Sequence, residues 1–250
     1  MDKLFNNKYY IIRVGDFATN GNRKILYFLF SLLLCFEEYF TIQSLNCFKI
    51  MFGSSIIWSF IELLLHLSNT RIIKPMYIGF GENKRIINNY LGICLQGLQE
   101  GGFVTTFGLY FADRLFQIKY FILLHLFITF IVFNIYFREN NEKLSKRQIN
   151  TPNSIFLMLS CTLYNLKMIY QYPEHNMRQF KMCFIMIYIS SIWTFLVWLR
   201  GFRKVEILLK NNNNYKEKEI TYFDSFYILG YDIVFEIAIA YLTFYNLFLI

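Results

Sequence analysis

The chain has 250 residues and a formal net charge of +8 at pH 7, with 56% apolar and 20% aromatic residues. Only 17% of its residues are charged, against about 25% in an average soluble domain. A soluble domain of this length could not bury so many Phe and Tyr side chains. The composition therefore excludes a disordered chain, a coiled coil and a compact soluble enzyme, and it indicates a membrane protein. The basic excess suits the loops of such a protein, so we expect no nucleic-acid partner.

Seven apolar segments follow a polar start, and each has about the 20 residues that a helix needs to cross a bilayer. No cleavage site of small residues follows the first segment, which is therefore predicted to stay as an anchor. The predicted fold is all-α: a polar cytoplasmic N-terminal segment, 1–24, and a single transmembrane domain, 25–250, built as a bundle of about seven helices. The spans are predicted at residues 25–45, 50–68, 87–111, 120–137, 153–172, 182–200 and 224–248.

Basic residues give this topology a direction, because Lys and Arg collect in cytoplasmic loops. Of the 25 Lys and Arg residues, 19 fall on the side of the membrane that holds the N-terminus, and five fall on the opposite side. The N-terminus is therefore predicted to be cytoplasmic and the C-terminus non-cytoplasmic. In the longest loop, Val205, Leu208 and Leu209 between Lys204 and Lys210 predict a short interfacial helix.

Six of the 17 acidic residues fall inside predicted spans. An acid at the centre of a membrane helix costs roughly 2.5–3.5 kcal/mol, so such residues usually mark an ion path, a proton relay or a ligand site. The alternative is that they are protonated packing residues with hydrogen bonds. All except Glu62 are predicted near mid-membrane. The six are Glu37, Glu38, Glu62, Glu100, Asp232 and Glu236.

Asp232 and Glu236 are four residues apart and share one helix face, where two like charges would not both ionise. This arrangement suits a proton carrier or an acid–base pair. Lys167, in the fifth span, neutralises one of the two acids if its helix is a neighbour. Otherwise it extends its charge to the outer interface.

The third span is the strongest candidate for a ligand site, over residues 96–102. Gln96 and Glu100 share a face, and Gly97 and Gly101 form a stripe of small residues. Such a stripe usually packs closely against another helix, and a homo-oligomer through the Gly97/Gly101 face is one form of this packing. The alternative is a break of the helix at Gly101 and Gly102 beside Glu100, as in the substrate sites of carriers.

The second span carries a polar stripe that ends with Glu62 and His66, one turn apart. We expect a hydrogen bond between them, because a shared metal ion would need more ligands than this pair offers. The other histidines, His125 and His175, fall at different depths. No metal or other cofactor is therefore predicted.

The five cysteines include no C-x-x-C motif, so neither a zinc ribbon nor a redox pair is predicted. Cys47 and Cys183 both map to the non-cytoplasmic side. They form a disulfide if that compartment is oxidising and their helices are neighbours, and otherwise they remain free thiols.

Three kinds of function fit these features, each with the lipid bilayer as a partner. The first is a carrier or channel for a small molecule or ion, with Glu100 at the site and proton coupling through Asp232 and Glu236. The second is a lipid-modifying membrane enzyme that uses the same acids with His66 or His125. The third is a structural or assembly protein of an organelle or viral membrane, in which the acids pair across helices or subunits.

Overall fold

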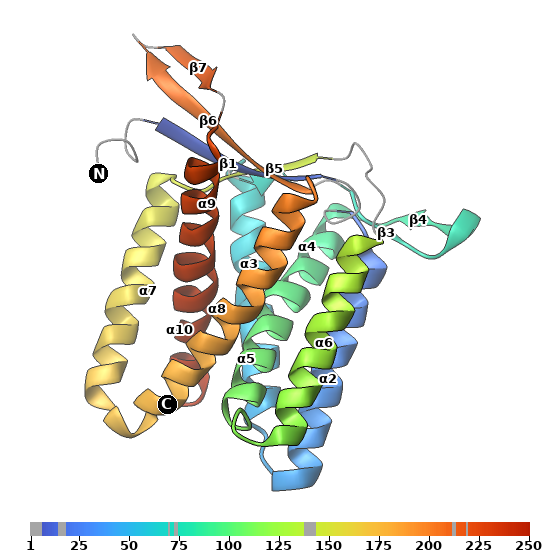
Figure 1. Cartoon of the computed structure of the whole chain (residues 1–250), viewed down its shortest axis with the longest axis vertical. Helices are drawn as coiled ribbons and strands as arrows, with labels where there is room; N and C mark the ends of the chain where they lie inside the picture. The colour runs from blue at the N-terminus through green and yellow to red at the C-terminus, as the bar shows by residue number, and fades with distance from the viewer. Residues whose placement is uncertain are drawn as a thin grey trace.

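The computed structural model describes residues 7–14, 19–69, 71–72, 75–137, 144–211, 214–218 and 220–250. Over these residues the chain is mostly helical, and seven helical rods run side by side along the long axis of the molecule (Figure 1). A β-sheet covers one end of the bundle, which we call the sheet end. The last helix finishes at the opposite end, which we call the far end.

The rods coincide with the predicted spans to within a few residues. Five are single helices: α2 (Gly21–Ile42), α3 (Asn46–Leu67), α6 (Ile118–Tyr136), α7 (Pro152–Gln171) and α8 (Asn176–Leu199), the last preceded by the 3₁₀ turn η4 (Pro173–His175). The third rod comprises α4 (Asn89–Gly97), the π-helix η3 (Leu98–Phe103) and α5 (Val104–Ala112). The seventh rod comprises α9 (Tyr222–Tyr231), the π-helix η5 (Asp232–Ile239) and α10 (Ala240–Phe248).

Five rods are long and apolar enough to cross a membrane: α2, α3, α6, α8 with its preceding turn, and the seventh rod. In the most apolar 18-residue stretch of each of these rods, only 28–50% is buried inside the chain. Many of their apolar side chains therefore face outward. Exposed residues such as Leu33, Phe40 and Ile56 show this outer surface. Apolar helices of this length with an apolar outer surface are compatible with a membrane-embedded protein.

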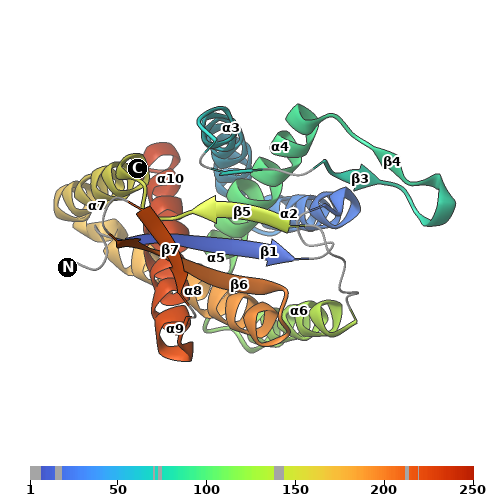
Figure 2. The same cartoon turned by 90° about the horizontal axis from the view of Figure 1, so that it is seen from above.

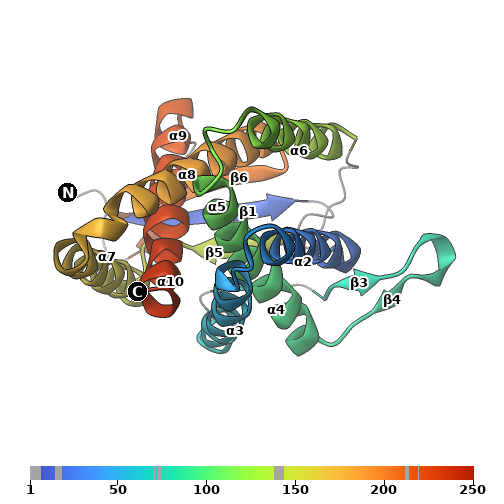
Figure 3. The ribbon, with the colours of Figure 1, turned by 90° about the horizontal axis from the view of Figure 1, so that it is seen from below.

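The third rod occupies the centre of the bundle. Its α5 helix packs against α2, α3, α8 and α10 and is surrounded by other helices when seen from the far end (Figure 3). Every residue from Thr105 to Ala112 is buried. A central rod is shielded from lipid by its neighbours, which allows it to carry polar side chains.

The sheet was not predicted from the sequence, so the all-α assignment is wrong in this part. It has five antiparallel strands in the order β2–β5–β1–β6–β7 and crosses over the helix ends (Figure 2). A separate hairpin projects sideways, formed by β3 (Tyr77–Ile78) and β4 (Arg85–Ile86), with the 3₁₀ turn η2 (Gly81–Asn83) between them. The sheet strands are β1 (Asn7–Val14), β2 (Arg71–Ile72), β5 (Leu144–Gln148), β6 (Arg203–Asn211) and β7 (Asn214–Lys218).

Strand β6 replaces the predicted interfacial helix, and β1 lies in the segment predicted only as polar. In β6 the β-branched residues Val205 and Ile207 alternate with polar neighbours, which suits a strand. Both are buried and pack with Tyr9 and Ile11 of β1 against α9. Because β6 has hydrogen-bonded neighbours on both sides, strand pairing prevails over the weak helical spacing of its leucines.

Candidate functional site

Three arginines from three adjacent strands point into the bundle from the sheet. Arg13 of β1 pairs directly with Arg203 of β6, and Ile11 of β1 pairs with Arg147 of β5. Residues paired across strands lie on the same face of a sheet, and so do residues two apart in one strand. The three guanidinium groups therefore share the face that covers the helices.

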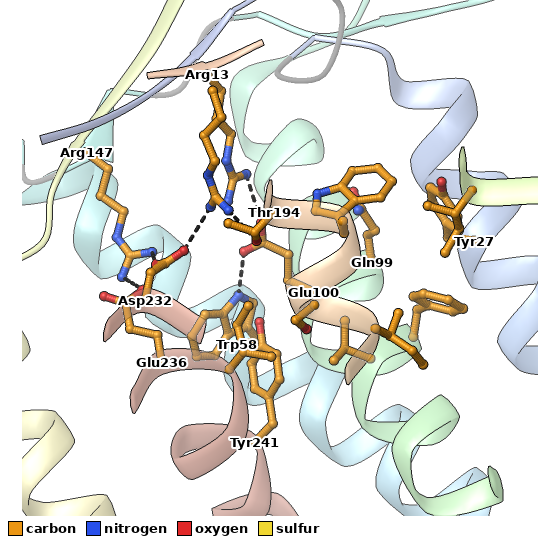
Figure 4. Close-up of a pocket in the computed structure, with 18 residues that line it drawn as sticks. Arg13, Tyr27, Trp58, Gln99, Glu100, Arg147, Thr194, Asp232, Glu236 and Tyr241 are labelled. Carbon is orange, nitrogen blue, oxygen red and sulfur yellow. Dashed lines mark hydrogen bonds and ion pairs between the residues drawn. The ribbon is translucent and has the colours of Figure 1, made fainter. Parts of the chain in front are cut away.

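Each arginine reaches a carboxylate in one of the two π-helices, and Figure 4 labels Arg13 and Arg147 with the three acids. Arg13 Nη1 lies 2.9 Å from Glu100 Oε1, and Arg203 Nη2 lies 2.9 Å from Asp232 Oδ2. Arg147 pairs with Glu236 and lies 3.8 Å from Asp232. Sheet and helices are thus joined by a network of three arginines and three acids.

Further polar side chains hold this network in place. The indole Nε1 of Trp58 donates to Glu100 Oε2 at 3.2 Å, and Arg203 Nη1 donates to Thr194 Oγ1 at 2.7 Å. The amide of Gln96 donates to the other oxygen of Glu100. Gln96 and Glu100 therefore do share one face, as predicted, and both belong to the site.

The third rod is widened at Glu100 but not broken. The hydrogen bonds of a π-helix join residues five apart instead of four, and short π-helices inside α-helices are frequent at functional sites. Ser54 of α3 donates to the Gly101 carbonyl at 3.0 Å, and Asn165 of α7 donates to the Ile239 carbonyl of η5 at 2.8 Å. Neighbouring helices thus satisfy carbonyl groups of both π-helices.

The stripe of small residues packs against another helix of the same chain. A Cβ atom at Gly101 would lie 2.5 Å from the Ser54 carbonyl oxygen, and one at Gly97 would lie 2.6 Å from the Ser59 nitrogen. The Gly97/Gly101 face is therefore covered by α3 of the same chain. It is not open to a second copy, contrary to the oligomer suggested by the sequence.

A cavity of about 110 Å³ lies beside the network, between the sheet and the middle of the bundle. Glu100 and Asp232 lie about 15 Å along their rods from the sheet end, at 1.5 Å per residue. One wall carries the three arginines and three acids. Much of the remaining lining is aromatic, with Tyr27, Trp58, Phe103, Trp193 and Tyr241. A smaller cavity of about 50 Å³ adjoins it and shares Arg13, Glu100 and Arg203.

Burial and the acids act in opposite directions on the arginines. Burial lowers the pKa of Arg203, and the Asp232 carboxylate opposes this shift. Burial also disfavours the charged form of Arg147, but the carboxylates of Glu236 and Asp232 outweigh it and raise the pKa of Arg147. Both side chains therefore keep their charge while shielded from water.

Three buried donors at this cavity have no hydrogen-bond partner within the described part of the chain. They are the Nε atoms of Arg203 and Arg147 and the hydroxyl of Tyr27. Arg203 is 6% exposed and Tyr27 is 4% exposed. A buried donor left unsatisfied costs about 1–3 kcal/mol, so the cavity is suited to a ligand or water that accepts hydrogen bonds.

Lys167 does not neutralise the acid pair, because it is exposed on the outer side of α7. Arg147 and Arg203 do so instead. The sequence places both arginines in loops, where the positive-inside rule accounts for them. A period-two pattern was the missed signal, because Arg203 precedes Val205 and Ile207 in alternation, as Arg147 precedes Ile149.

The other predicted acids lie outside the cavity. Glu37 and Glu38 were expected near mid-membrane, but α2 begins earlier and ends at Ile42, so both lie in its last two turns, at the far end. Glu37 accepts hydrogen bonds from Tyr110 at 2.7 Å and Tyr120 at 3.0 Å. Glu38 accepts one from the backbone of Cys47 at 2.7 Å.

Glu62 is buried on α3, and His66 is half-buried one turn nearer the sheet end; neither lines the cavity. His125 contacts Tyr188, and His175 contacts Tyr245; neither histidine lines the cavity. Among the residues that the structure describes, no three His, Cys, Asp or Glu side chains form a metal-binding group.

The disulfide considered for Cys47 and Cys183 is not formed, and both cysteines are free thiols. Cys47 lies in the first turn of α3, which packs mainly on α2, α10 and the third rod. Cys183 lies on α8, which packs mainly on α5, α6 and η5. The two helices are not close neighbours, so the condition set for a disulfide is not met.

No family model, curated protein or solved structure matches this chain. The chemistry of the site must therefore be judged from its own groups. Three guanidinium groups and three carboxylates in a shielded cavity can exchange partners with an incoming polar ligand. A pair of carboxylates one turn apart can also hold a proton between them.

Proposed function

We propose that the chain is a membrane carrier for a small molecule, and that the cavity between the sheet and the π-helices is its binding site. The observation that carries the proposal is the position of the cavity. It lies near the middle of the bundle, and the three arginines that close it belong to the sheet. Movement of the sheet would open the site to one side of the membrane without breaking a helix.

In this proposal the chain crosses the membrane seven times, with the sheet end in the cytoplasm. Seven rods place β1 and the end of α10 at opposite ends of the bundle. The asymmetry of 19 basic residues against five supports a cytoplasmic sheet end. The third rod and α7 are less apolar than the other rods, and the central position of the third rod accounts for its polar residues.

Two layers flank the cavity in the structure. On the sheet side, the Arg13–Glu100, Arg203–Asp232 and Arg147–Glu236 pairs close it. On the far side, buried apolar residues of α5, among them Phe107 and Phe111, fill the bundle. Opening one layer at a time is what alternating access requires.

Proton coupling is the second part of the proposal. Asp232 and Glu236 contact the same guanidinium group, and a proton on Glu236 would release Arg147 from it. The titratable and charged groups around this pair are Arg13 on β1, Tyr27 on α2, Glu100 on η3, Arg147 on β5, Arg203 on β6, and Tyr231 and Tyr241 on the seventh rod. Three of these seven groups are arginines, which stay charged, so a proton that enters this site is taken up by a carboxylate.

Accessibility from the two sides of the membrane tests the carrier. Thr194 and Ser190 line the cavity from α8, and each is replaced by Cys in a cysteine-free background. A membrane-impermeant maleimide is then applied to either side of oriented proteoliposomes. A carrier that alternates between two states is labelled at these positions from both sides.

The matched control is Ser54→Cys, which is fully buried between α3 and the third rod, outside the cavity. It should be labelled from neither side. Labelling of the cavity positions from one side only would contradict a carrier and favour an enzyme or receptor with a one-sided site. No labelling from either side would indicate a dry bundle with a structural role.

A further inference from the structure

The cavity has more hydrogen-bond donors than its own acceptors use. A guanidinium group has five N–H donors, and three such groups converge here with the Trp58 indole and the Tyr27 hydroxyl. The Arg203 Nε and the Tyr27 hydroxyl are both more than nine-tenths buried and have no partner in the described part of the chain. A ligand that satisfies them has to accept hydrogen bonds.

The type of donor narrows the class of ligand. Guanidinium groups present planar forks that match the oxygens of carboxylates, phosphates and sulfonates. They are also the groups that keep their charge when buried, and burial of Arg203 is accompanied by attraction from Asp232 and Glu100. An incoming oxyanion would take the place that these carboxylates now hold.

The opposite wall fits an apolar part of the same ligand. Tyr27 and Trp193 meet edge to face with ring centroids 6.2 Å apart, and Trp58 and Tyr241 meet at 5.0 Å. These rings, with Ile131 and Ile189, form an apolar surface that faces the charged wall. A volume of about 110 Å³ has room for a small organic group rather than for a polymer.

We infer that the cavity binds an oxyanion carried by a small molecule with an apolar part, and that Arg203 and Arg13 hold the oxyanion. The inference rests on the carrier function proposed above and names the class of its substrate. Within the cavity the three arginines match the three acids in charge, so the anion adds one negative charge. One proton on the Asp232–Glu236 pair keeps the total charge unchanged, so anion and proton enter together.

Tryptophan fluorescence gives a direct measurement of binding. The chain has three tryptophans, and Trp58 and Trp193 both line the cavity, whereas Trp198 packs on Phe195 and Tyr222 outside it. A Trp198→Phe background therefore reports from the cavity. The probe is benzenesulfonate, whose charge does not change with pH, and benzyl alcohol is the neutral match.

Benzenesulfonate should cause a saturable fluorescence change, and benzyl alcohol should not. Arg203→Gln combined with Asp232→Asn removes one charge of each sign and so avoids an unpaired buried acid. This double variant should bind the probe about tenfold more weakly or worse, since hydrogen bonds to charged groups contribute about 1.5–3 kcal/mol. The matched control, Lys204→Gln, alters the exposed neighbour on the other face of β6 and should bind as the background does.

The pH dependence tests the proton. Affinity for benzenesulfonate should fall as pH rises, because the acid pair then loses its proton. In Glu236→Gln this position is uncharged at every pH, so the affinity of the variant for benzenesulfonate should no longer depend on pH. An affinity that is independent of pH in the parent background would overturn the coupling of anion and proton.

Two sources of the oxyanion give different results. A soluble substrate predicts that benzenesulfonate competes with benzoate in detergent. A lipid substrate predicts that dioleoylphosphatidate in nanodiscs displaces the probe, whereas benzoate does not. Equal binding by benzyl alcohol, or by the double variant, would overturn the oxyanion site. If Thr194→Cys is labelled from both sides but no anion binds, the carrier stands and this inference fails. If the anion binds but Thr194→Cys is labelled from one side only, the oxyanion site stands and the carrier fails.

Discussion

The close approach of α3 to the third rod sets the position of Glu100, and Gly97→Ala tests it. In the structure a Cβ at residue 97 would lie 2.6 Å from the backbone nitrogen of Ser59 and 2.7 Å from its Cα. These atoms belong to a helix backbone and cannot rotate away, so α3 has to move. Overpacking of this kind costs about 1–3 kcal/mol.

Alanine is also the better helix former, which offsets part of that cost by about 1 kcal/mol. We therefore expect Gly97→Ala to destabilise the protein by up to about 2 kcal/mol. At about 2–4 °C per kcal/mol for a chain of this size, the midpoint of thermal unfolding should fall by up to roughly 8 °C. The fall is measured by differential scanning fluorimetry on protein in a mild detergent.

Gly230→Ala is the matched control, because Gly230 is helical in α9 and a Cβ there would have no heavy atom within 4 Å. Its midpoint should stay the same or rise. If Gly97→Ala behaves as Gly230→Ala does, α3 and the third rod do not approach this closely. The hydrogen bond from Trp58 to Glu100 would then lose its structural basis.

Three further predictions concern the rest of the bundle. Asn165→Leu should lower the free energy of unfolding by about 1–3 kcal/mol, because a buried carbonyl of η5 loses its donor; Lys167→Leu, on the exposed side of the same helix, should leave the unfolding midpoint unchanged. Glu37→Gln should lower that midpoint, because the buried Arg114 at the far end loses its ion pair with Glu37; the exposed Glu174→Gln is its control. Single cysteines at Glu206 and Glu174 should react with an impermeant maleimide from opposite sides of the membrane, and labelling from the same side would refute the topology.

The helices could be predicted because each depends on local sequence. A run of apolar residues of bilayer length forms its hydrogen bonds within itself, so its existence follows from composition alone. The acid pair Asp232 and Glu236 could be placed on one face for the same reason. Even so, the ends of α2 differ from prediction by three or four residues, which moves Glu37 and Glu38 from the expected middle to the far end.

The sheet could not be predicted in the same way, because its strands are far apart in the chain. Arg13 comes from the N-terminal segment and Arg147 and Arg203 from two loops, and only the pairing of β1 with β5 and β6 brings them together. The positive-inside rule already accounts for arginines in loops, so their ion pairs with the acids were not predicted. An acid inside a span is therefore the stronger sequence signal, and its partner has to be sought in the loops.

The division of charges between sheet and helices has a consequence for how the site opens. Breaking a buried ion pair by separating its partners costs about 3–5 kcal/mol, because it leaves charges without compensation. Three such pairs join the sheet to the bundle, so the empty site should remain closed. An oxyanion that takes the place of Glu100 or Asp232 beside an arginine, with a proton on the acid that it displaces, removes that cost. Since a ligand shifts an equilibrium only through its different affinity for the two states, this exchange would make opening depend on substrate.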